Sequence, residues 1–442
     1  MVTTGFLRSR SSHTLAKPIA RVALLTVFLT ALAPFAVRAE EAVELSLPEA
    51  YQMALEYNHD IKSAVESVQQ GTLLQKQAVT VLFPQLTADA GYSKTRYQDG
   101  TRYDGSSWGV SLSQTVYNGG RVWVAKRGAQ YTLNAAEQGL EFARQSVLMD
   151  LVARSNELLT AEDLLKVSEK RVERVSEGLR QAQTRLELGD VSKSIVLSAQ
   201  VVLSSAQLEK VEAQKAVTLA ATRLSRLIGA ESHLHVKIPA VVSTNEELPL
   251  QTLIDKAVGG RPDLAQSREL IRIAREEAEL VRRTGRPDVN ITGSYTQYSD
   301  DDLFAPESQI GINLRWPFFQ GGLVRLQTKE SLSRVRQSEE VYGSQLDTVT
   351  LEVEEALLNV KALKAQKKLV EDNLVTAVEN HRLARARFDL GAAIGLEVLK
   401  AEEDLAEAEN LEVKYRYDTR TAQARLLYSI GALDLSAFGQ GK

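Results

Sequence analysis

The chain contains two similar copies of one sequence, about two hundred residues apart. The segment beginning at Leu45 (LSLPEAYQMALEYNHDI) matches the segment beginning at Leu248 (LPLQTLIDKAVGGRPDL), and Tyr92 in FPQLTADAGY matches Tyr295 in RPDVNITGSY, both at an offset of 203 residues. At an offset of 202 residues, LSQTVYNGGRV matches LRWPFFQGGLV, RLELG matches RFDLG and RLSRLIGA matches RLLYSIGA. Solenoid repeats are only about 20 to 50 residues long. The long period therefore indicates a duplicated half-protein, and the fold must contain two similar halves.

The first 39 residues predict an export signal. Four basic residues precede an apolar run from Val22 to Phe35, and the small residues Val37 and Ala39 suit cleavage before Glu40. An N-terminal membrane anchor is the alternative, but the run is shorter than the ~20 apolar residues that a helical span needs.

Charge and cysteine content exclude several classes of protein. Removal of the signal leaves 48 Lys and Arg residues against 57 Asp and Glu residues, a net charge of −9, which argues against nucleic acid as a partner. The absence of cysteine excludes disulfides, thiolate metal sites, a cysteine nucleophile and an acylated N-terminus. No later segment has the 18 uncharged apolar residues of a membrane-spanning helix. Any insertion into a membrane would therefore use β-structure.

Each half predicts helices followed by a β-hairpin. The helices cover residues 47–82 and 249–283, and the hairpins cover residues 86–117 and 288–318. Apolar residues alternate with small polar residues along these strands. Strands of about ten residues with one apolar and one polar face are typical of outer-membrane barrels. A soluble sheet packed on helices stays an alternative, because the alternation in a single strand is a weak signal.

A glycine pair follows each hairpin and precedes a long helical stretch. The pairs Gly119-Gly120 and Gly321-Gly322 stand at the predicted strand-to-helix junctions, where glycine permits a tight change of direction. Helical hairpins without proline are predicted over residues 121–229 and 323–431. Each outgoing helix of about 66 residues would be roughly 100 Å long.

In the first long helix, apolar residues recur every seven residues, which is the period of a coiled coil. A second row, offset by three residues from this apolar row, contains mostly small residues, which predicts close helix packing. The second copy has Lys367 and His381 at two of the matching positions, so we expect different surroundings for its seam. The row in the first copy consists of Leu151, Leu158, Leu165, Val172, Leu179 and Leu186.

These elements predict four regions: the signal (1–39), a first structural repeat (40–245), a second (246–434) and a C-terminal tail (435–442). The fold class is mainly α with membrane β, a long coiled-coil helical barrel plus four strands per chain. Four strands cannot close a barrel, because known outer-membrane barrels have eight or more. Three chains would supply twelve, whereas eight leave room only for side chains. A homotrimer with a 12-stranded outer-membrane β-barrel is therefore predicted.

In these features the chain resembles the outer-membrane efflux protein family, the TolC-type exit ducts. The resemblance covers the mature length and is carried by FPQL at 83–86, the aromatic-x-Gly-Gly elements at 117–120 and 319–322, the pair RLELG and RFDLG, and the closing RLIGA and SIGA. It implies a channel in the cell outer membrane of a Gram-negative bacterium, with its helical barrel in the periplasm. Such a duct passively conducts substrates received from an inner-membrane transporter through a periplasmic adaptor, has no cofactor and catalyses nothing.

The resemblance also implies functional residues at the ends of the long helices. Adaptor docking would involve the turn residues Arg185, Leu188, Gly189, Arg387, Leu390 and Gly391. The structural alternative is that the two glycines are only left-handed helix stops.

A periplasmic gate is implied beside these turns, at Ser194, Ala393, Glu397 and Lys400. Glu397 matches an acidic ring of the family, whereas Lys400 reverses the charge of a second ring and Ala393 replaces a gate arginine of some relatives. A Glu397 ring would favour cations. Alternatively, Glu397 and Lys400 form an ordinary exposed helix pair.

Other functions have weaker support. The duct of a type I protein secretion system would have the same architecture, and a soluble periplasmic coiled-coil adaptor is the rival from another class. The pair His233 and His235 suggests a metal site, but no carboxylate or thiolate partner accompanies it. No catalytic motif is present, so no enzyme activity is predicted. The transported substrate, whether drug, metal or protein, is not encoded in these patterns.

Overall fold

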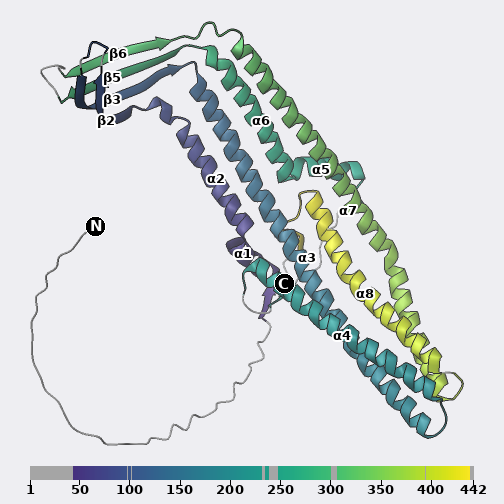
Figure 1. Ribbon diagram of the computed structural model, residues 1–442. Helices are drawn as coiled ribbons and strands as arrows, with labels where there is room; N and C mark the ends of the chain where they lie inside the picture. Colours follow the sequence, from purple (N-terminus) through teal and green to yellow (C-terminus); the bar gives the residue numbers. More distant parts are fainter. Residues whose placement is uncertain are drawn as a thin grey trace, which may run out of the picture. The chain divides into compact units, whose positions relative to one another are not determined.

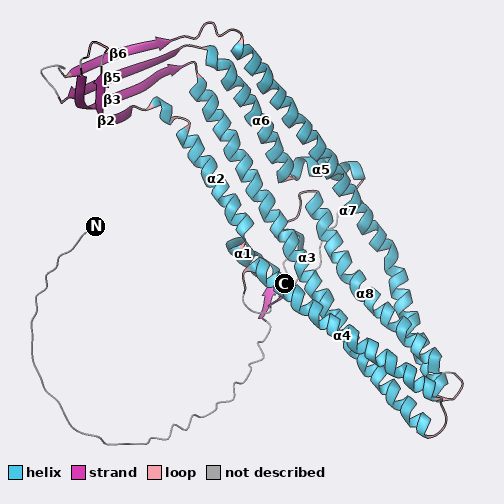
Figure 2. Cartoon of the chain, viewed as in Figure 1, coloured by secondary structure: helices cyan, strands magenta, loops and turns pink. Residues whose placement is uncertain are grey.

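The computed structural model of the chain describes residues 43–96, 98–100, 102–230, 234–237, 247–299, 306–393 and 395–438. Helices make up most of this part, and four strands form a sheet beside one end of the long helices (Figures 1 and 2). The predicted export signal lies outside the described residues. None of the described helices is both long enough and apolar enough to span a membrane.

Helices and strands follow one another in the same order in the two halves. The first half contains β1 (Val43–Ser46), α1 (Leu47–Tyr57), α2 (His59–Gln77), the 3₁₀ turn η1 (Thr80–Leu82), β2 (Gln85–Arg96), β3 (Arg102–Asn118), α3 (Arg121–Glu187) and α4 (Lys193–Ile228). The second half contains β4 (Leu234–Lys237), α5 (Leu250–Gly260), α6 (Pro262–Arg282), η3 (Arg283–Gly285), β5 (Asp288–Tyr298), β6 (Glu307–Arg315), α7 (Leu323–Asp389), α8 (Gly395–Ser429) and η4 (Leu435–Phe438).

Side chains at the helix starts explain where several helices begin. Ser46 and Glu49 form a reciprocal capping box at the start of α1. The Asn58 side-chain oxygen accepts hydrogen bonds from the backbone N–H groups of Asp60 and Ile61, at 2.8 and 3.2 Å, and so caps α2. In the second half, Pro262 occupies the first position of α6, where its missing N–H costs nothing.

Proline limits an element in each half. Helix α2 ends at Gln77, and the chain tightens into η1, which ends at residue 82 as predicted for the helical segment and where the Phe83 N–H donates to the Thr80 carbonyl at 2.9 Å. Pro84 disfavours helical geometry at Phe83, whose ψ is 151°. The second hairpin ends at Arg315 rather than at residue 318, because Pro317 has no N–H for the sheet.

The two β-hairpins join into one antiparallel sheet with the strand order β2-β3-β5-β6. Strand β3 pairs with β5 along most of its length, with Val110 opposite Tyr295, and a bulge between Thr115 and Tyr117 shifts the register. The continuous β2–β3 register, with Leu86 opposite Leu112, keeps the alternating apolar residues on one face. The first and last strands of the sheet, β2 and β6, each have an unpaired edge within the described chain.

The helices lie side by side in the same order as the strands from which they extend. Next to the sheet, α3 packs against α2 and α6, and α6 packs against α7. Farther away, α4 replaces α2 beside α3, and α8 replaces α6 between α3 and α7 (Figure 1). The helices α3 and α7 therefore run through the whole helical part, and the shorter helices stack end to end beside them.

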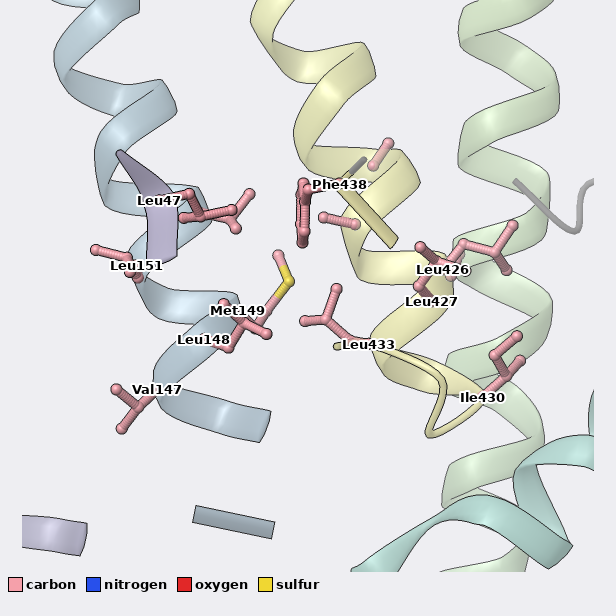
Figure 3. Close-up of a cluster of buried hydrophobic side chains, with 14 of the residues drawn as sticks. Leu47, Val147, Leu148, Met149, Leu151, Leu426, Leu427, Ile430, Leu433 and Phe438 are labelled. Atoms are coloured by element: carbon pink, nitrogen blue, oxygen red, sulfur yellow. The ribbon is translucent and has the colours of Figure 1, made fainter. Parts of the chain in front are cut away.

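The main hydrophobic core lies midway along α3 and α7, where the shorter helices meet. Figure 3 shows Leu47, Leu151, Leu426 and Phe438 in this cluster. The C-terminal residues 435–442 are expected to be a tail, but η4 is packed, with Phe438 only 2% exposed. The described end of the chain is therefore part of the core.

A parallel strand pair beside this core is absent from the sequence predictions. Strand β1 pairs with β4, with Val43 opposite Leu234 and Glu44 opposite His235. The other histidine of the suggested metal pair, His233, lies outside the described residues. Within the described part of the chain, no group of three metal-binding side chains occurs.

Small residues, rather than the leucine row, form the closest helix contacts toward the distal end of α3. Leu151 and Leu158 are buried near the core, but Leu165 and Leu179 are only half-buried. Small side chains let the helix backbones approach closely, which is why they are buried at a period of seven. The buried row of α3 consists of Ala161, Ser168, Val175 and Ala182.

A buried guanidinium joins the start of α6 to α7 and α8. The Arg261 side chain is 6% exposed and binds both carboxyl oxygens of Asp263 at 3.0 and 2.8 Å, Glu352 at 2.6 Å and the Ser429 carbonyl at 3.2 Å. Burial acts to raise the pKa of the Asp263 carboxyl, but the hydrogen bonds and charge of Arg261 outweigh it and lower that pKa below its usual value.

We predict that Arg261→Met lowers the free energy of unfolding by about 3–5 kcal/mol, because it removes one partner of a buried ion pair. Denaturant unfolding of the purified full-length protein, followed by circular dichroism, measures this change. The stabilising effect of the Asp263 carboxylate is present above about pH 4 and is lost as the pH falls through its lowered folded-state pKa. The free energies of unfolding of the wild type and of Arg261→Met should therefore converge as the pH is lowered.

The matched control is Arg226→Met, which removes an exposed guanidinium near the end of α4. It should change the free energy of unfolding by at most about 0.5 kcal/mol. Equal stability of Arg261→Met and the wild type at neutral pH would contradict a stabilising role for the cluster.

Candidate functional site

The candidate site consists of the two turns that connect α3 to α4 and α7 to α8. We call residues 188–192 the first tip and residues 390–393 the second tip. Both lie at the end of the helical part that is farthest from the sheet (Figure 1). All the predicted docking residues belong to these tips or to the helix turns that precede them.

The two tips have the same backbone geometry. In the first, the Gly189 N–H donates to the Leu186 carbonyl at 3.1 Å, and the Asp190 N–H donates to the Arg185 carbonyl at 2.9 Å. The second repeats both bonds from Gly391 and Ala392, at 3.1 and 2.8 Å. This is the Schellman motif, which requires a left-handed residue, and the two glycines have φ of 79° and 72°.

The turn geometry leaves a leucine projecting at each tip. Leu188 is 72% exposed and Leu390 is 84% exposed, so neither contributes to the core of the described chain. A single exposed leucine is ordinary. Two leucines at matching positions of adjacent turns form a paired apolar surface at the end of the molecule.

Arg185 connects the first tip to the second. Its guanidinium donates to the Phe388 carbonyl at 2.7 Å and to Asp389 Oδ1 at 3.1 Å, and it lies 4.4 Å from the centre of the Phe388 ring. A cation at this place is favoured by the carbonyl groups at the C-terminal end of α7 and by the aromatic ring. The side chain therefore holds the ends of α3 and α7 together.

Arg387, the matching residue of the second copy, stays within its own tip. Its guanidinium donates to Glu397 Oε2 and to the Ala392 carbonyl, both at 3.2 Å. The same residue type at the same position thus has different partners in the two copies. This difference depends on which helix lies next to each tip.

The predicted gate residues do not form one cluster. Glu397 pairs with Arg387, whereas Lys400 pairs with Glu403 at 3.3 Å and Asp404 at 3.0 Å. Glu397 and Lys400 thus bind other partners rather than each other, and both side chains are exposed on α8. Ser194 Oγ lies 2.7 Å from Ser192 Oγ on the exposed start of α4.

A groove with a volume of about 970 Å³ separates the two tips. Ala393 is half-buried in its wall, so a small residue here keeps the groove open. Charged residues of both signs stand beside apolar ones, which suits an amphipathic protein segment better than a small apolar ligand. The lining includes Arg180, Arg185, Leu188, Asp190, Val191, Phe388, Asp389 and Leu390.

A buried ionic cluster behind the tips links α3, α7 and α8. Glu402 is only 4% exposed. Its carboxylate accepts a hydrogen bond from Arg174 Nε at 2.9 Å and lies 2.9 Å from His381 Nε2. Arg174 also reaches Glu409 at 3.0 Å. Sequence reasoning did not predict this cluster. One residue in the sequence could have indicated it: His381 stands at the position that matches Leu179 of the apolar row in the first copy.

Further polar contacts continue along the boundary between α3 and α8. The Tyr417 hydroxyl donates to Asp163 Oδ2 at 2.7 Å, and the Asn156 side-chain amide donates to Thr421 Oγ1 at 2.9 Å. Together with the Glu402 cluster and Arg185, they form a series of polar links between the two helical hairpins.

The strand-to-helix junctions differ in their surroundings. Arg283 donates to the Gly120 carbonyl at 3.0 Å, and Arg286 donates to the Gly119 carbonyl at 3.3 Å. Gly119 and Gly120 turn the chain with positive φ values of 68° and 76°, which leaves their carbonyl groups accessible to the two arginines. Gly321 and Gly322 have φ of 59° and 84°, but a Cβ built on either would meet nothing within 4 Å in the described part of the chain.

Comparison with known proteins supports one family. The family model for outer membrane efflux proteins matches residues 50–230 and 253–432, once in each half. The chain is 23% identical over 425 residues to the Pseudomonas aeruginosa alkaline protease secretion protein AprF, covering 89% of this chain and 86% of AprF. It is 24% identical over 402 residues to the Vibrio cholerae outer membrane protein TolC, covering 88% of this chain and 91% of TolC.

The fold is also similar to that of solved outer-membrane channels. The Campylobacter jejuni CmeC outer membrane channel superimposes with a TM-score of 0.76 at 19% sequence identity, covering 88% of this chain and 86% of CmeC.

We predict that Arg185→Ala loosens the second tip, because it removes charge-assisted hydrogen bonds to the last turn of α7. Each such bond contributes about 1.5–3 kcal/mol, so amides of residues 389–392 should exchange at least about tenfold faster. Hydrogen–deuterium exchange of the purified protein measures this rate. Arg180→Ala is the matched control, because Arg180 binds only Glu177 of its own helix among the described residues. Unchanged exchange in Arg185→Ala would mean that Arg185 does not hold the tips together.

Proposed function

Because the chain belongs to the outer membrane efflux protein family, we propose that it forms, as a homotrimer, the outer-membrane exit duct of a tripartite efflux system. The duct conducts substrates passively from a periplasmic adaptor and inner-membrane transporter to the cell exterior. Its sheet contributes to a β-barrel in the outer membrane of a Gram-negative cell, and its helices form a tube in the periplasm.

The observation that carries this proposal is that the sheet and the helical layer are open at corresponding edges. The sheet ends at β2 on one side and at β6 on the other. The helix layer next to it ends at α2 and α7, which are the helices connected to those strands. A second copy placed beside the first would therefore extend both layers together, pairing β6 with β2 and α7 with α2.

The open helix edges also expose apolar side chains. Burial of such surface contributes about 25 cal/mol per Å², which favours association of the edges. The exposed residues are Val65, Leu73 and Leu74 on α2, and Leu323, Leu326 and Leu332 on α7.

The internal boundary between the halves supports a ring of three chains. Within one chain, β5 and α6 pack against β3 and α3. The duplication matches α7 to α3 and α2 to α6, so the same side-by-side packing can be repeated between α7 of one chain and α2 of the next. Six hairpins supply twelve strands, which leaves a pore, whereas four hairpins supply eight, which does not.

The groove between the tips suits the docking of the adaptor. Its two projecting leucines are exposed without a structural role in the described chain, and Arg185 keeps the tips at a fixed spacing. A helical segment with apolar and charged positions would complement this lining.

Glu397 is the acidic residue proposed to face the periplasmic gate. Its pairing with Arg387 leaves each chain with one partly neutralised carboxylate. Lys400 contributes no free positive charge to this ring, because its ammonium is bound to Glu403 and Asp404. A trimer would thus place a weakly cation-favouring ring at the entrance.

The duct of a type I secretion system is the second candidate. The similarity to the protease secretion protein AprF favours it specifically, and it uses the same architecture. The inner-membrane transporter decides between the two candidates, because the described residues of the chain form no substrate pocket of defined chemistry.

We predict that cysteines at one pair of positions form a disulfide between neighbouring chains. Within one chain, Val110 on β3 lies opposite Tyr295 on β5. The duplication matches Val110 to Ile312 and Tyr295 to Tyr92, so Ile312 on β6 should lie opposite Tyr92 on β2 of the next chain. The chain has no cysteine, so the double variant Ile312→Cys/Tyr92→Cys should give trimers resistant to denaturant under oxidising conditions. Denaturing gel electrophoresis of outer membranes measures them, and planar-bilayer recordings of the same protein should detect conductance.

The register control combines Ile312→Cys with Leu86→Cys, which lies on the same face but six residues away, about 20 Å along the strand. It should give few cross-links. Equal cross-linking in the two variants would contradict the proposed edge pairing, and a non-conducting monomer would contradict the duct itself.

We further predict that Leu390→Glu reduces substrate export at least about tenfold while trimer levels stay normal. A carboxylate in an apolar contact costs several kcal/mol on docking, but this side chain stabilises nothing within the described chain. Export from the native host and trimer content measure the two effects. Leu270→Glu places the same charge on an exposed leucine of α6 and should leave export unchanged. Loss of the trimer in Leu390→Glu would make the tip a structural element instead.

A further inference from the structure

The apolar face of the β2–β3 hairpin continues into a group of basic residues. The register pairs Ala90 with Trp108 and Tyr92 with Ser106, and then Lys94 with Asp104 and Arg96 with Arg102. Partners across an antiparallel ladder, and every second residue along a strand, point to the same face. The four charged side chains therefore lie on the face that carries the apolar band, beyond its last aromatic residue.

The position of these residues along the strands corresponds to a lipid headgroup region. The apolar band on this face ends in an aromatic row, where Trp108 contacts Tyr295 with ring centres 5.9 Å apart. Arg96 lies four residues beyond Tyr92, about 13 Å along the strand and about 10 Å along the membrane normal at the usual tilt of outer-membrane strands. Aromatic girdles mark the interface, and the polar headgroups begin above it.

The two arginines face each other directly. Like charges at directly opposite positions of a ladder destabilise the pairing. Both side chains are exposed, and no ion pair joins either guanidinium to another residue within the described chain. By contrast, Lys94 is paired with Asp104 at 2.8 Å. An anion placed between the two guanidinium groups would turn a repulsive pair into a bidentate site.

We propose that Arg96 and Arg102, with Lys94 beside them, form a clamp for the phosphate groups of anionic lipids in the outer leaflet of the membrane. The proposal rests on the duct function above. A lipid is favoured over a dissolved anion because the clamp continues the apolar face, whereas the opposite face of the sheet would meet dissolved solutes. Arginine also matches phosphate oxygens through two parallel hydrogen bonds.

Only the first hairpin has this clamp. The duplication matches Lys94 to Gln297 and Arg96 to Ser299, which are neutral. A trimer would therefore present three clamps, alternating with three hairpins that lack the matching basic residues, and would bind anionic lipid at three separate places around its circumference.

The test uses purified full-length trimers that have first been found to conduct. Lipid A, which has two phosphate groups, is titrated against the protein in neutral detergent, and bound lipid is counted by native mass spectrometry. Each basic residue near an anionic lipid surface contributes about 1 kcal/mol, so Arg96→Gln/Arg102→Gln should bind lipid A about thirtyfold more weakly. Phosphatidylcholine binding should be the same in both proteins, and salt should weaken only the lipid A binding.

The control is Arg226→Gln/Lys256→Gln, which removes two exposed positive charges from α4 and α5. It should bind lipid A like the wild type. Equal affinity in the Arg96/Arg102 variant and the wild type would overturn the clamp. Displacement of lipid A by millimolar inorganic phosphate would overturn the choice of lipid, because it would identify a site for dissolved anions. In either case conduction by the trimers would leave the duct function standing, whereas a non-conducting monomer would contradict that function and not the clamp alone.

Discussion

The unpaired backbone of an edge strand is the constraint on which the rest of the structure depends. In lipid, each N–H or C=O group without a partner costs several kcal/mol, and a sheet of four strands has two such edges. The chain cannot remove these edges by itself, because four strands are too few to close on themselves. The duplication makes β2 a copy of β5 and β6 a copy of β3, so the two edges are complementary, and the proposed ring would pair the β6 edge of one chain with the β2 edge of the next. The helices follow the same rule, since α2 and α7 border the helical layer just as β2 and β6 border the sheet.

Repetition of local sequence accounts for the parts that could be predicted. The limits of α3 and α7 follow from the glycine pairs before them, the tip glycines after them and the lack of proline between, all of which act within a few residues. The alternation that reveals β2 and β3 is equally local. The turn geometry at Gly189 and Gly391 was predictable for the same reason, because only a residue that tolerates positive φ closes the Schellman motif.

The parts that could not be predicted depend on residues far apart in the sequence. Pairing of β1 with β4 joins segments about 190 residues apart, and four residues per strand carry too little pattern to indicate a partner. Phe438 looks like part of a tail because nothing nearby identifies the pocket that buries it. Arg185 and Arg387 occupy equivalent positions, yet only the arrangement of the neighbouring helices decides that the first crosses to α7 and the second stays with Glu397. The docking and gating roles of the tips stay predictions for the same reason, because they depend on partners outside the chain.

Apolar and polar contacts both hold the helical part together, and they are distributed unevenly along it. Within the first hairpin, small residues at a period of seven, such as Val175 and Ala182 of α3, are buried, and ion pairs such as Lys210–Glu169 also join α3 to α4. Between the hairpins, α3 meets α8 through the apolar core near Leu151 and Leu426 and, toward the tips, through polar contacts of Asp163 and Arg174. Water competes for polar contacts once they begin to part, whereas it does not replace apolar packing. The apolar core midway along the helices is therefore the more robust join between the two hairpins, and the polar links nearer the tips are the weaker one.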